Sequence, residues 1–294
     1  MNHAHLVMSF ANNIILPTKN HHVIFNPDEE TVMAFAEING ITMHYELIGD
    51  ADSKHLLVFS NSLGTDFRIW LPLFDELGED ISVLLCDSRG HGLSEVGDKP
   101  FTIEDLADDL VALVDALEIR KATFCGLSVG GLVVQALWQK RPDLVKKLVL
   151  SNTAAKIGDH ASWNTRIDAI RKDGIAGMSA GIMQRWFTES FHEERPEDVA
   201  GYRLMVERQP LAGYIHTCAA IRDADYTALA PSISVPTLCI VGDGDGSTPP
   251  DLVRAFADLI PGARFEVIED CGHIPCIAQP EALAALLQTF VKKG

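Results

Sequence analysis

The sequence predicts an α/β fold in which a mostly parallel, eight-stranded sheet is flanked by helices and carries an inserted helical cap. From about residue 35, short apolar or β-branched runs alternate with longer segments of helical periodicity, as in sheets whose parallel strands are joined by helices. Several runs are almost entirely apolar, which is typical of strands buried on both faces. The alternation stops between about residues 154 and 226, where the pattern is helical, and resumes near residue 235.

The helix that follows Thr102 is the best defined of the expected elements. Its apolar residues recur at helical spacing, and Thr102 with Asp105 forms an N-terminal capping pattern. A second helix is expected from just after Ser128 to about Lys140, and a last helix over residues 281–292. The strand candidates are residues 41–47, 56–60, 81–86, 122–126, 147–151, 236–242 and 264–268.

The expected domain organisation has four segments, namely an N-terminal tail, a first part of the α/β core, the helical cap and a second part of the core. In this order they span residues 1–32, 33–153, 154–228 and 229–294. The cap segment is rich in large aromatic side chains, among them Trp163, Trp186 and Tyr214. The sequence has no internal repeat and no low-complexity tract.

Composition excludes several classes of function. The chain has 294 residues, of which 47% are hydrophobic, enough for a buried core. Its 41 acidic and 24 basic residues give a net charge of −17, which opposes sequence-independent binding to nucleic acid or to an anionic membrane. No run approaches the roughly 18–20 apolar residues of a membrane span, and the N-terminus lacks a secretory signal pattern. We therefore expect a cytoplasmic protein that binds neither nucleic acid nor a membrane, and a homo-oligomer remains possible.

The six cysteines show no paired C-x-x-C spacing, and several lie inside apolar runs. We expect them to be small buried side chains in a reducing compartment, not a disulfide framework. No metal site is expected, because ligand residues are not clustered. The cysteines are Cys86, Cys125, Cys218, Cys239, Cys271 and Cys276.

A G-x-S-x-G motif occupies residues 126–130, between an expected strand and an expected helix. In that context the motif predicts a tight turn that lifts the side chain of Ser128 clear of the sheet. Its neighbours at two positions must be glycine to avoid clashes. Ser128 is therefore the candidate nucleophile. The alternative is a small-residue turn that contains a serine by chance.

A serine hydroxyl is a poor nucleophile unless a base removes its proton during attack. His273 is the best candidate, because it follows the last expected strand and so lies at the same sheet edge as Ser128. The base needs an acid that holds its tautomer, and the loop after the preceding strand offers Asp243 and Asp245. Asp245 is preferred because it lies deeper in that loop, whereas Asp243 is expected to bond to local backbone. The order Ser128, Asp245, His273 differs from those of chymotrypsin and subtilisin.

An oxyanion hole needs two preorganised backbone N–H groups. One is expected from Val129, the residue after the nucleophile, and the other from Leu63 in the loop of residues 60–64. The alternative is that residues 60–64 form an ordinary polar loop.

Residues 36–292 resemble the α/β-hydrolase superfamily. Residues 87–94 look like the D-x-R-G-x-G-x-S turn that its members carry after the fourth strand, a part of the scaffold. A narrower resemblance is to the 3-oxoadipate enol-lactonases. It is carried by Ser60-Asn61-Ser62-Leu63-Gly64-Thr65, by residues 151–158, by Arg185-Trp186-Phe187-Thr188, by Gly213-Tyr214 and by residues 218–225.

The loop that holds the candidate acid also resembles that of the enol-lactonases, which favours Asp245 over Asp243. The chain departs from the family at Gly246 and Ser247. The matching residues are Gly242, Asp245, Thr248, Pro249 and Pro250.

The resemblance implies a reaction, the hydrolysis of a five-membered enol-lactone to a 3-oxo-dicarboxylate in the degradation of aromatic compounds. Ser128 would attack the ring carbonyl, and the N–H groups of Leu63 and Val129 would hold the oxyanion. Water activated by His273 would then release the acyl group. No metal or organic cofactor is implied.

The carboxylate of such a substrate needs a local cation in an acidic protein. Arg166 and Arg185 in the cap are the candidates, because an arginine fork suits a carboxylate. Trp163 and Trp186 are expected to form apolar walls, and Ser62 is expected to contact the substrate. The alternative is that both arginines lie at the surface and both tryptophans fill the core of the cap.

Other functions would use the same triad. A general carboxylesterase, another lactonase or a C–C bond hydrolase would keep Ser128, and only the substrate would change. A haloalkane dehalogenase is disfavoured, because that chemistry needs a carboxylate at this position. A non-enzymatic ligand receptor remains an alternative, although a binding pocket needs no complete triad.

Overall fold

The computed structural model describes residues 34–293, so the expected tail of residues 1–32 lies outside the described part. Eight strands form one sheet in the order β1-β2-β4-β3-β5-β6-β7-β8. β1 and β2 pair antiparallel, β2 is antiparallel to β4, and the remaining neighbours are parallel. The strands are β1 (Ala34–Ile38), β2 (Ile41–Ile48), β3 (Leu56–Ser60), β4 (Ser82–Cys86), β5 (Ala122–Leu127), β6 (Val145–Ser151), β7 (Thr237–Gly242) and β8 (Arg264–Ile268).

This sheet confirms the predicted fold class. Seven strands coincide with the seven candidates to within two residues at each end. The eighth, β1, was not among the candidates. It is an edge strand whose residues are mostly half-buried or exposed, so its sequence lacks the continuous apolar run that marks the central strands.

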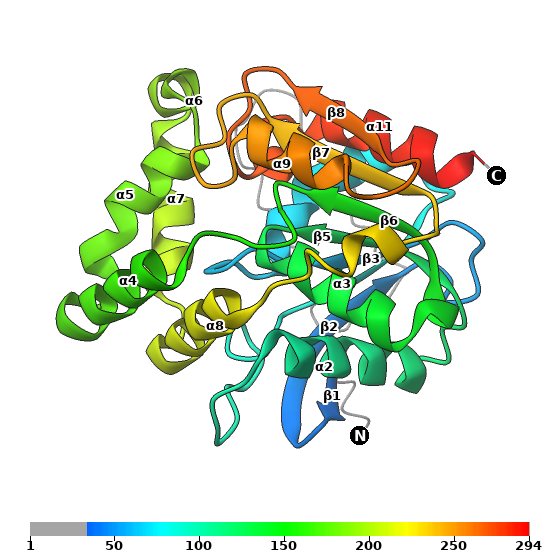
Figure 1. Ribbon diagram of the computed structural model, residues 1–294, viewed down its shortest axis with the longest axis horizontal. Coiled ribbons are helices and arrows are strands. Elements are labelled where there is room, and N and C mark those ends of the chain that lie inside the picture. Colours follow the sequence, from blue (N-terminus) through cyan, green and yellow to red (C-terminus); the bar gives the residue numbers. More distant parts are fainter. Residues whose placement is uncertain (1–33, 294) are drawn as a thin grey trace, which may run out of the picture. The chain divides into compact units, whose positions relative to one another are not determined.

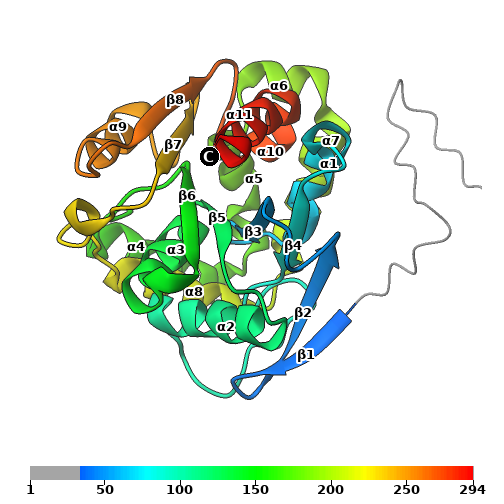
Figure 2. The same cartoon turned by 90° about the vertical axis from the view of Figure 1, so that its right-hand side faces the viewer.

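Helices cover both faces of the sheet (Figure 2). α2, α3 and α9 lie on one face, whereas α1, α10 and α11 lie on the other. Thr102 caps α2 as predicted, because its hydroxyl accepts from the Asp105 N–H while the Asp105 carboxylate accepts from the Thr102 N–H. The bounds are α1 (Phe74–Leu77), α2 (Ile103–Ala116), α3 (Val129–Lys140), α9 (Pro250–Ala257), α10 (Pro275–Ala278) and α11 (Pro280–Lys292), with short 3-10 helices at Phe67–Leu73, Pro142–Leu144 and Ala230–Ser232.

Five further helices lie between β6 and β7 in the sequence, within the segment expected to be the cap. Figure 1 shows them together beyond the carboxyl ends of the parallel strands. Gly213 in this group meets Gly90 of the core so closely that a Cβ on Gly213 would lie 2.2 Å from the Gly90 carbonyl oxygen. The helices are α4 (His160–Asp173), α5 (Ala176–Trp186), α6 (Glu189–Glu194), α7 (Pro196–Glu207) and α8 (Leu211–Asp223).

All six cysteines are buried and unpaired, as expected from their apolar surroundings. Within residues 34–293, no helix combines the length and the hydropathy that a membrane crossing would require.

The turn between β5 and α3 is the tightest element of the core. Ser128 stands in it with φ 59° and ψ −117°, a conformation that side-chain-bearing residues rarely adopt and that costs about 1–3 kcal/mol. Hydrogen bonds to β6 and to the segment after it help to hold Ser128 there. The Ser128 N–H donates to the Ser151 carbonyl at 3.0 Å, and the Thr153 hydroxyl donates to the Ser128 carbonyl at 2.7 Å.

The glycines of the turn are required by close backbone contacts. A Cβ on Gly126 would lie 2.3 Å from the Gly130 carbonyl oxygen, and a Cβ on Gly130 would lie 2.1 Å from the Ser60 carbonyl oxygen. Backbone atoms cannot yield as a flexible side chain can. The two glycines therefore let β5, α3 and the end of β3 approach closely around Ser128.

Two glycine-to-alanine changes test this packing. Gly130→Ala should lower the free energy of unfolding by about 2–3 kcal/mol, because the added methyl overlaps a neighbouring backbone. Gly201→Ala, in helix α7, is the matched control. Outside its chain neighbours and its own helix backbone, no atom lies within 4 Å of the added Cβ, so the change should raise stability by about 0.5 kcal/mol. Urea denaturation followed by circular dichroism measures both, and equal effects would contradict the packing argument.

Candidate active site

The expected site residues follow strands that end at the same edge of the sheet. Ser60 of β3 pairs with Gly126 of β5, and Leu127 pairs with Ser151 of β6. Gly242 of β7 in turn pairs with Ile268 of β8. Because these strands are parallel, the loops after them meet at one edge, which is where open α/β sheets bind ligands.

His273 and Asp245 form a direct pair at this edge. The Nδ1 atom of His273 lies 2.9 Å and 3.0 Å from the two carboxylate oxygens of Asp245. Both side chains are buried, and the His273 N–H donates to the Trp186 carbonyl at 2.8 Å. With Nδ1 held by a carboxylate, Nε2 is the ring nitrogen left to accept a proton.

Several donors stabilise the charge of Asp245. Its carboxylate accepts hydrogen bonds from Asn152 Nδ2 at 2.9 Å, from the Thr248 hydroxyl at 2.7 Å and from the N–H groups of Ser247 and Thr248. Burial raises the pKa of this carboxyl, but the charge of His273 and these hydrogen bonds outweigh burial and lower the pKa below its usual range. Asn152 was not singled out from the sequence, although its position directly after a buried strand is the signal that could have found it.

Asp243, the competing candidate, lies elsewhere in the same loop. Its side chain is exposed and accepts a hydrogen bond from the Cys271 N–H at 3.0 Å. It thus bonds to backbone, as expected, although the partner belongs to the loop before His273. The structure brings Asp245, and not Asp243, to the histidine.

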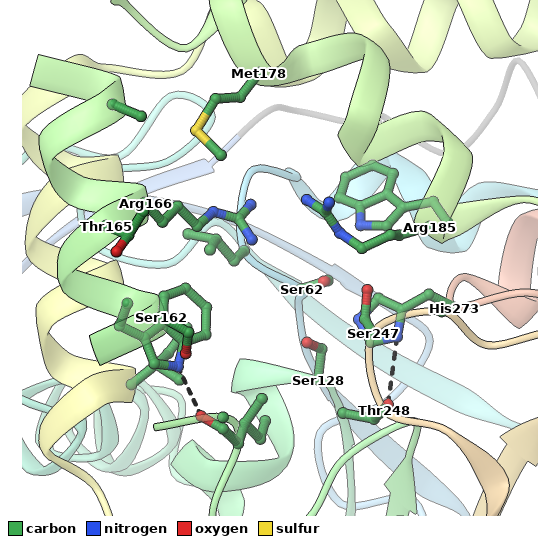
Figure 3. Close-up of a pocket in the computed structure, with 18 residues that line it drawn as sticks. Ser62, Ser128, Ser162, Thr165, Arg166, Met178, Arg185, Ser247, Thr248 and His273 are labelled. Atoms are coloured by element: carbon green, nitrogen blue, oxygen red, sulfur yellow. Dashed lines mark hydrogen bonds between the residues drawn. The ribbon is translucent and has the colours of Figure 1, made fainter. Parts of the chain in front are cut away.

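A cavity of about 430 Å³ opens above these loops, within the usual range of small-molecule sites. Ser128 and His273 lie at its base, and α4 and α5 provide its upper walls (Figure 3). Eight of the residues singled out from the sequence line it. They are Ser62, Leu63, Ser128, Trp163, Arg166, Arg185, Trp186 and His273.

Arg166 reaches the cavity from α4 and is held by aromatic side chains. Its guanidinium stacks over the rings of Trp163 and Tyr214, at 5.3 Å and 5.7 Å from the ring centroids. It also donates to the Tyr214 hydroxyl, and the Trp163 indole N–H donates to the Ile157 carbonyl at 2.7 Å. Tyr214 is fully buried. No role for Tyr214 was predicted, because its contact with Arg166 joins two different cap helices.

Arg185 reaches the cavity from the end of α5, opposite Arg166 (Figure 3). Burial and the charge of Arg166 lower the pKa of Arg185. A guanidinium nevertheless remains charged in proteins. The backbone of Arg185 is bonded to the loop that holds Asp245, because the Gly246 N–H donates to the Arg185 carbonyl at 3.3 Å. Within residues 34–293, the cavity lining includes no aspartate or glutamate.

Two backbone N–H groups remain available beside Ser128. Val129 is the first residue of α3, where a helix leaves its N–H without an internal acceptor. Leu63 lies in the loop after β3 and lines the cavity. In the part of the chain that the structure describes, no backbone carbonyl accepts a hydrogen bond from either N–H.

A second aspartate–histidine pair lies outside this cavity. His44 Nδ1 lies 2.7 Å from an Asp87 carboxylate oxygen, and Asp87 also accepts from the N–H groups of Phe67 and Leu93. Asp87 thus ties together the turn of residues 87–94, the scaffold role that the resemblance implied. Among the described residues, no cluster of three or more potential metal-ligating side chains is found.

Comparisons with known proteins agree with this geometry. Residues 55–280 match the family described as alpha/beta hydrolase fold. The chain is similar to 3-oxoadipate enol-lactonases 2 and 1 of Acinetobacter baylyi, each 34% identical over 253 residues, which are 86% of this chain and 94% of either relative.

Solved structures extend the comparison. The crystal structure of the enol-lactonase from Burkholderia xenovorans LB400 is 37% identical with a TM-score of 0.84, over 88% of this chain and 100% of that chain. A thermophilic esterase from Thermogutta terrifontis is 29% identical with a TM-score of 0.81, over 89% of this chain and 98% of that chain. The chain is therefore a hydrolase that belongs to the α/β-hydrolase superfamily and, within it, to the family of the 3-oxoadipate enol-lactonases.

Proposed function

We propose that this hydrolase opens 3-oxoadipate enol-lactone to 3-oxoadipate through an acyl-enzyme. One observation carries the proposal: a single cavity contains a serine on a strand-to-helix turn, a histidine paired with a carboxylate, and two arginines. The names of the relatives supply the substrate. A general esterase would need the serine and the histidine but not two arginines, so the arginines favour an anionic substrate.

The first step is attack by the Ser128 hydroxyl on the ring carbonyl carbon. His273, held through Nδ1 by Asp245, accepts the serine proton at Nε2. The N–H groups of Leu63 and Val129 bind the oxygen on which negative charge develops. The loss of one such donor typically costs about 3–4 kcal/mol of transition-state stabilisation.

Ring opening then expels the enol oxygen, which receives its proton from His273. An enol is a better leaving group than an alkoxide, and its conversion to the ketone draws the step forward. Water attacks the acyl group while His273 accepts the water proton. Collapse of the second intermediate releases the 3-oxo-dicarboxylate, and the proton returns to Ser128. No step requires a metal or an organic cofactor.

The carboxylate of the substrate is bound between Arg166 and Arg185. Ser62, Trp163 and Trp186 line the same cavity and complete the substrate site, with the tryptophans as apolar walls. The proposed partner of the protein is therefore this small lactone.

Replacing Ser128 by alanine tests the nucleophile. Ser128→Ala should lower kcat for enol-lactone hydrolysis by about a millionfold, the size of the effect in subtilisin. The assay follows the loss of enol-lactone ultraviolet absorbance. Ser232→Ala, which removes an exposed hydroxyl from a 3-10 helix, should retain full activity. An active Ser128→Ala variant would exclude the mechanism.

Asp243 and Asp245 lie in the same loop after β7, so variants of the two residues form a matched pair. Asp245→Asn should lower kcat by about 10⁴, as in the corresponding change in a serine protease, because the amide no longer holds the required histidine tautomer. Asp243→Asn keeps an oxygen that can accept from the Cys271 N–H and should stay within about tenfold of the wild type. Steady-state kinetics on the enol-lactone measures both, and a reversed order would reject Asp245 as the acid.

Tyr214→Phe tests how Arg166 is positioned. The change removes the hydroxyl to which Arg166 donates and keeps the ring. KM for the enol-lactone should rise by about tenfold or more with kcat little changed, because a hydrogen bond to a charged group contributes about 1.5–3 kcal/mol. Tyr226→Phe removes a hydroxyl bonded to Glu104 outside the cavity and should leave KM unchanged. A fall in kcat at constant KM would contradict this role for Tyr214.

A further inference from the structure

Two guanidinium groups enter the cavity without an acidic partner. Arg166 and Arg185 point toward one another across its upper part in Figure 3. Neither forms an ion pair with any described residue, and the Nε atom of Arg166 is buried without a hydrogen-bond partner. Placing two like charges together is unfavourable unless a ligand supplies negative charge. The cavity is therefore preorganised for an anionic group at its upper end.

Apart from the arginines and the site residues at the base, the cavity is lined by apolar side chains, glycines and a few hydroxyl groups. Ile157, Met178 and Ile221 line the cavity, and methionine adapts its shape to different ligands. Such walls suit a chain of methylene groups as well as they suit a ring. Among the described residues that line the cavity, the arginines carry the positive charge, and the ester-cleaving residues lie at the base.

The acyl-enzyme itself contains no ring. Once Ser128 has opened an enol-lactone, the acyl group is a linear chain that ends in a carboxylate. An acyclic ester whose acyl chain ends in a carboxylate would give an acyl-enzyme of the same type. The arginines would then bind that terminal carboxylate in both cases.

We propose a further activity, the hydrolysis of acyclic half-esters of dicarboxylic acids, in which Arg166 and Arg185 bind the free carboxylate while Ser128 is acylated. The inference rests on the proposed function for the roles of Ser128 and His273. It extends the substrate class from a lactone to open-chain esters with an anionic end. Neutral esters of the same length are poorer substrates.

The chemistry balances with water as the only co-reactant. The bond from Ser128 Oγ to the acyl carbon forms, the bond to the ester oxygen breaks, and His273 transfers the serine proton to the departing alcohol or phenol. Water then attacks the acyl carbon and gives a proton to His273. The Oγ–acyl bond breaks, Ser128 regains its proton, and the free dicarboxylate leaves.

The test compares two chromogenic esters that differ in a single charge. One is the mono-p-nitrophenyl ester of adipic acid, and the other is the same compound with its free carboxyl capped as a methyl ester. The release of p-nitrophenolate gives kcat/KM, and the Ser128→Ala variant gives the uncatalysed background. We expect at least about a tenfold preference for the anionic ester, the size of one charged hydrogen bond. Equal rates, or a preference for the capped ester, would overturn the proposal.

Replacing the two arginines tests whether the preference for the anionic ester arises in the cavity. Arg166→Met and Arg185→Met should each reduce the ratio of the two kcat/KM values toward one. Arg171→Met is the matched control, since Arg171 lies on the same helix as Arg166 but is exposed beside Asp168. It should retain the wild-type ratio. Retention of the ratio in both cavity variants would overturn the assignment.

The enol-lactone is assayed with the same preparations, so that the two proposals can fail separately. An enzyme that hydrolyses the lactone but shows no preference for the anionic half-ester overturns only this inference. An enzyme that prefers the half-ester and leaves the lactone intact overturns only the proposed function.

Half-esters of four- to eight-carbon diacids extend the test. The preference should be largest near six carbons, the length of the opened lactone, and a ratio that is the same at every length would overturn the fit to the arginines.

Discussion

The contact between His273 Nδ1 and the Asp245 carboxylate is the interaction on which the rest of the site depends. It joins loops from two neighbouring strands and buries a carboxylate. Burial alone would raise the pKa of that group and disfavour its charged form, which stabilises an imidazolium. Asn152, Thr248 and the Ser247 N–H keep it ionised by donating to it. The pairing of His273 with an ionised Asp245 therefore requires that the loops after β6, β7 and β8 be held together.

The loops after β7 and β8 also position the end of α5, which forms one wall of the cavity. The Trp186 carbonyl accepts from the His273 N–H, and the Arg185 carbonyl accepts from the Gly246 N–H. A Cβ on Gly272 would lie 2.0 Å from that Trp186 carbonyl oxygen, so the approach leaves no space for a side chain. The end of α5 is thus bonded directly to the loops of the acid and the base. The proposed anion site at Arg185 and the proposed base His273 are therefore linked through backbone hydrogen bonds.

The parts predicted from the sequence are those with local signals. Buried strands, the capping box at Thr102 and the turn at Ser128 depend on neighbouring residues, and the structure agrees with each of them. β1 was missed because an edge strand with one solvated face carries a weak pattern.

The contacts that the sequence did not predict join distant segments. The bond from Asn152 to Asp245 spans 93 residues, and the contact of Arg166 with Tyr214 spans 48. Neither has a spacing that a sequence pattern could reveal. The choice between Asp243 and Asp245 depended partly on resemblance for the same reason, since their environments differ only once the loop is folded.

The net negative charge of the chain and the proposed binding of an anion in the cavity are compatible, because charge is unevenly distributed. A net charge of −17 repels an anionic substrate at long range, but salt at physiological strength screens such repulsion beyond about 8 Å. The two arginines are the cationic side chains of the described cavity lining, which contains no aspartate, and because both are partly buried, water screens their attraction for a carboxylate less than it would at the surface. The proposed specificity for an anion therefore depends on two side chains and their aromatic neighbours. The acidic surface sets solubility and the rate of encounter, and does not decide which small molecule the cavity accepts.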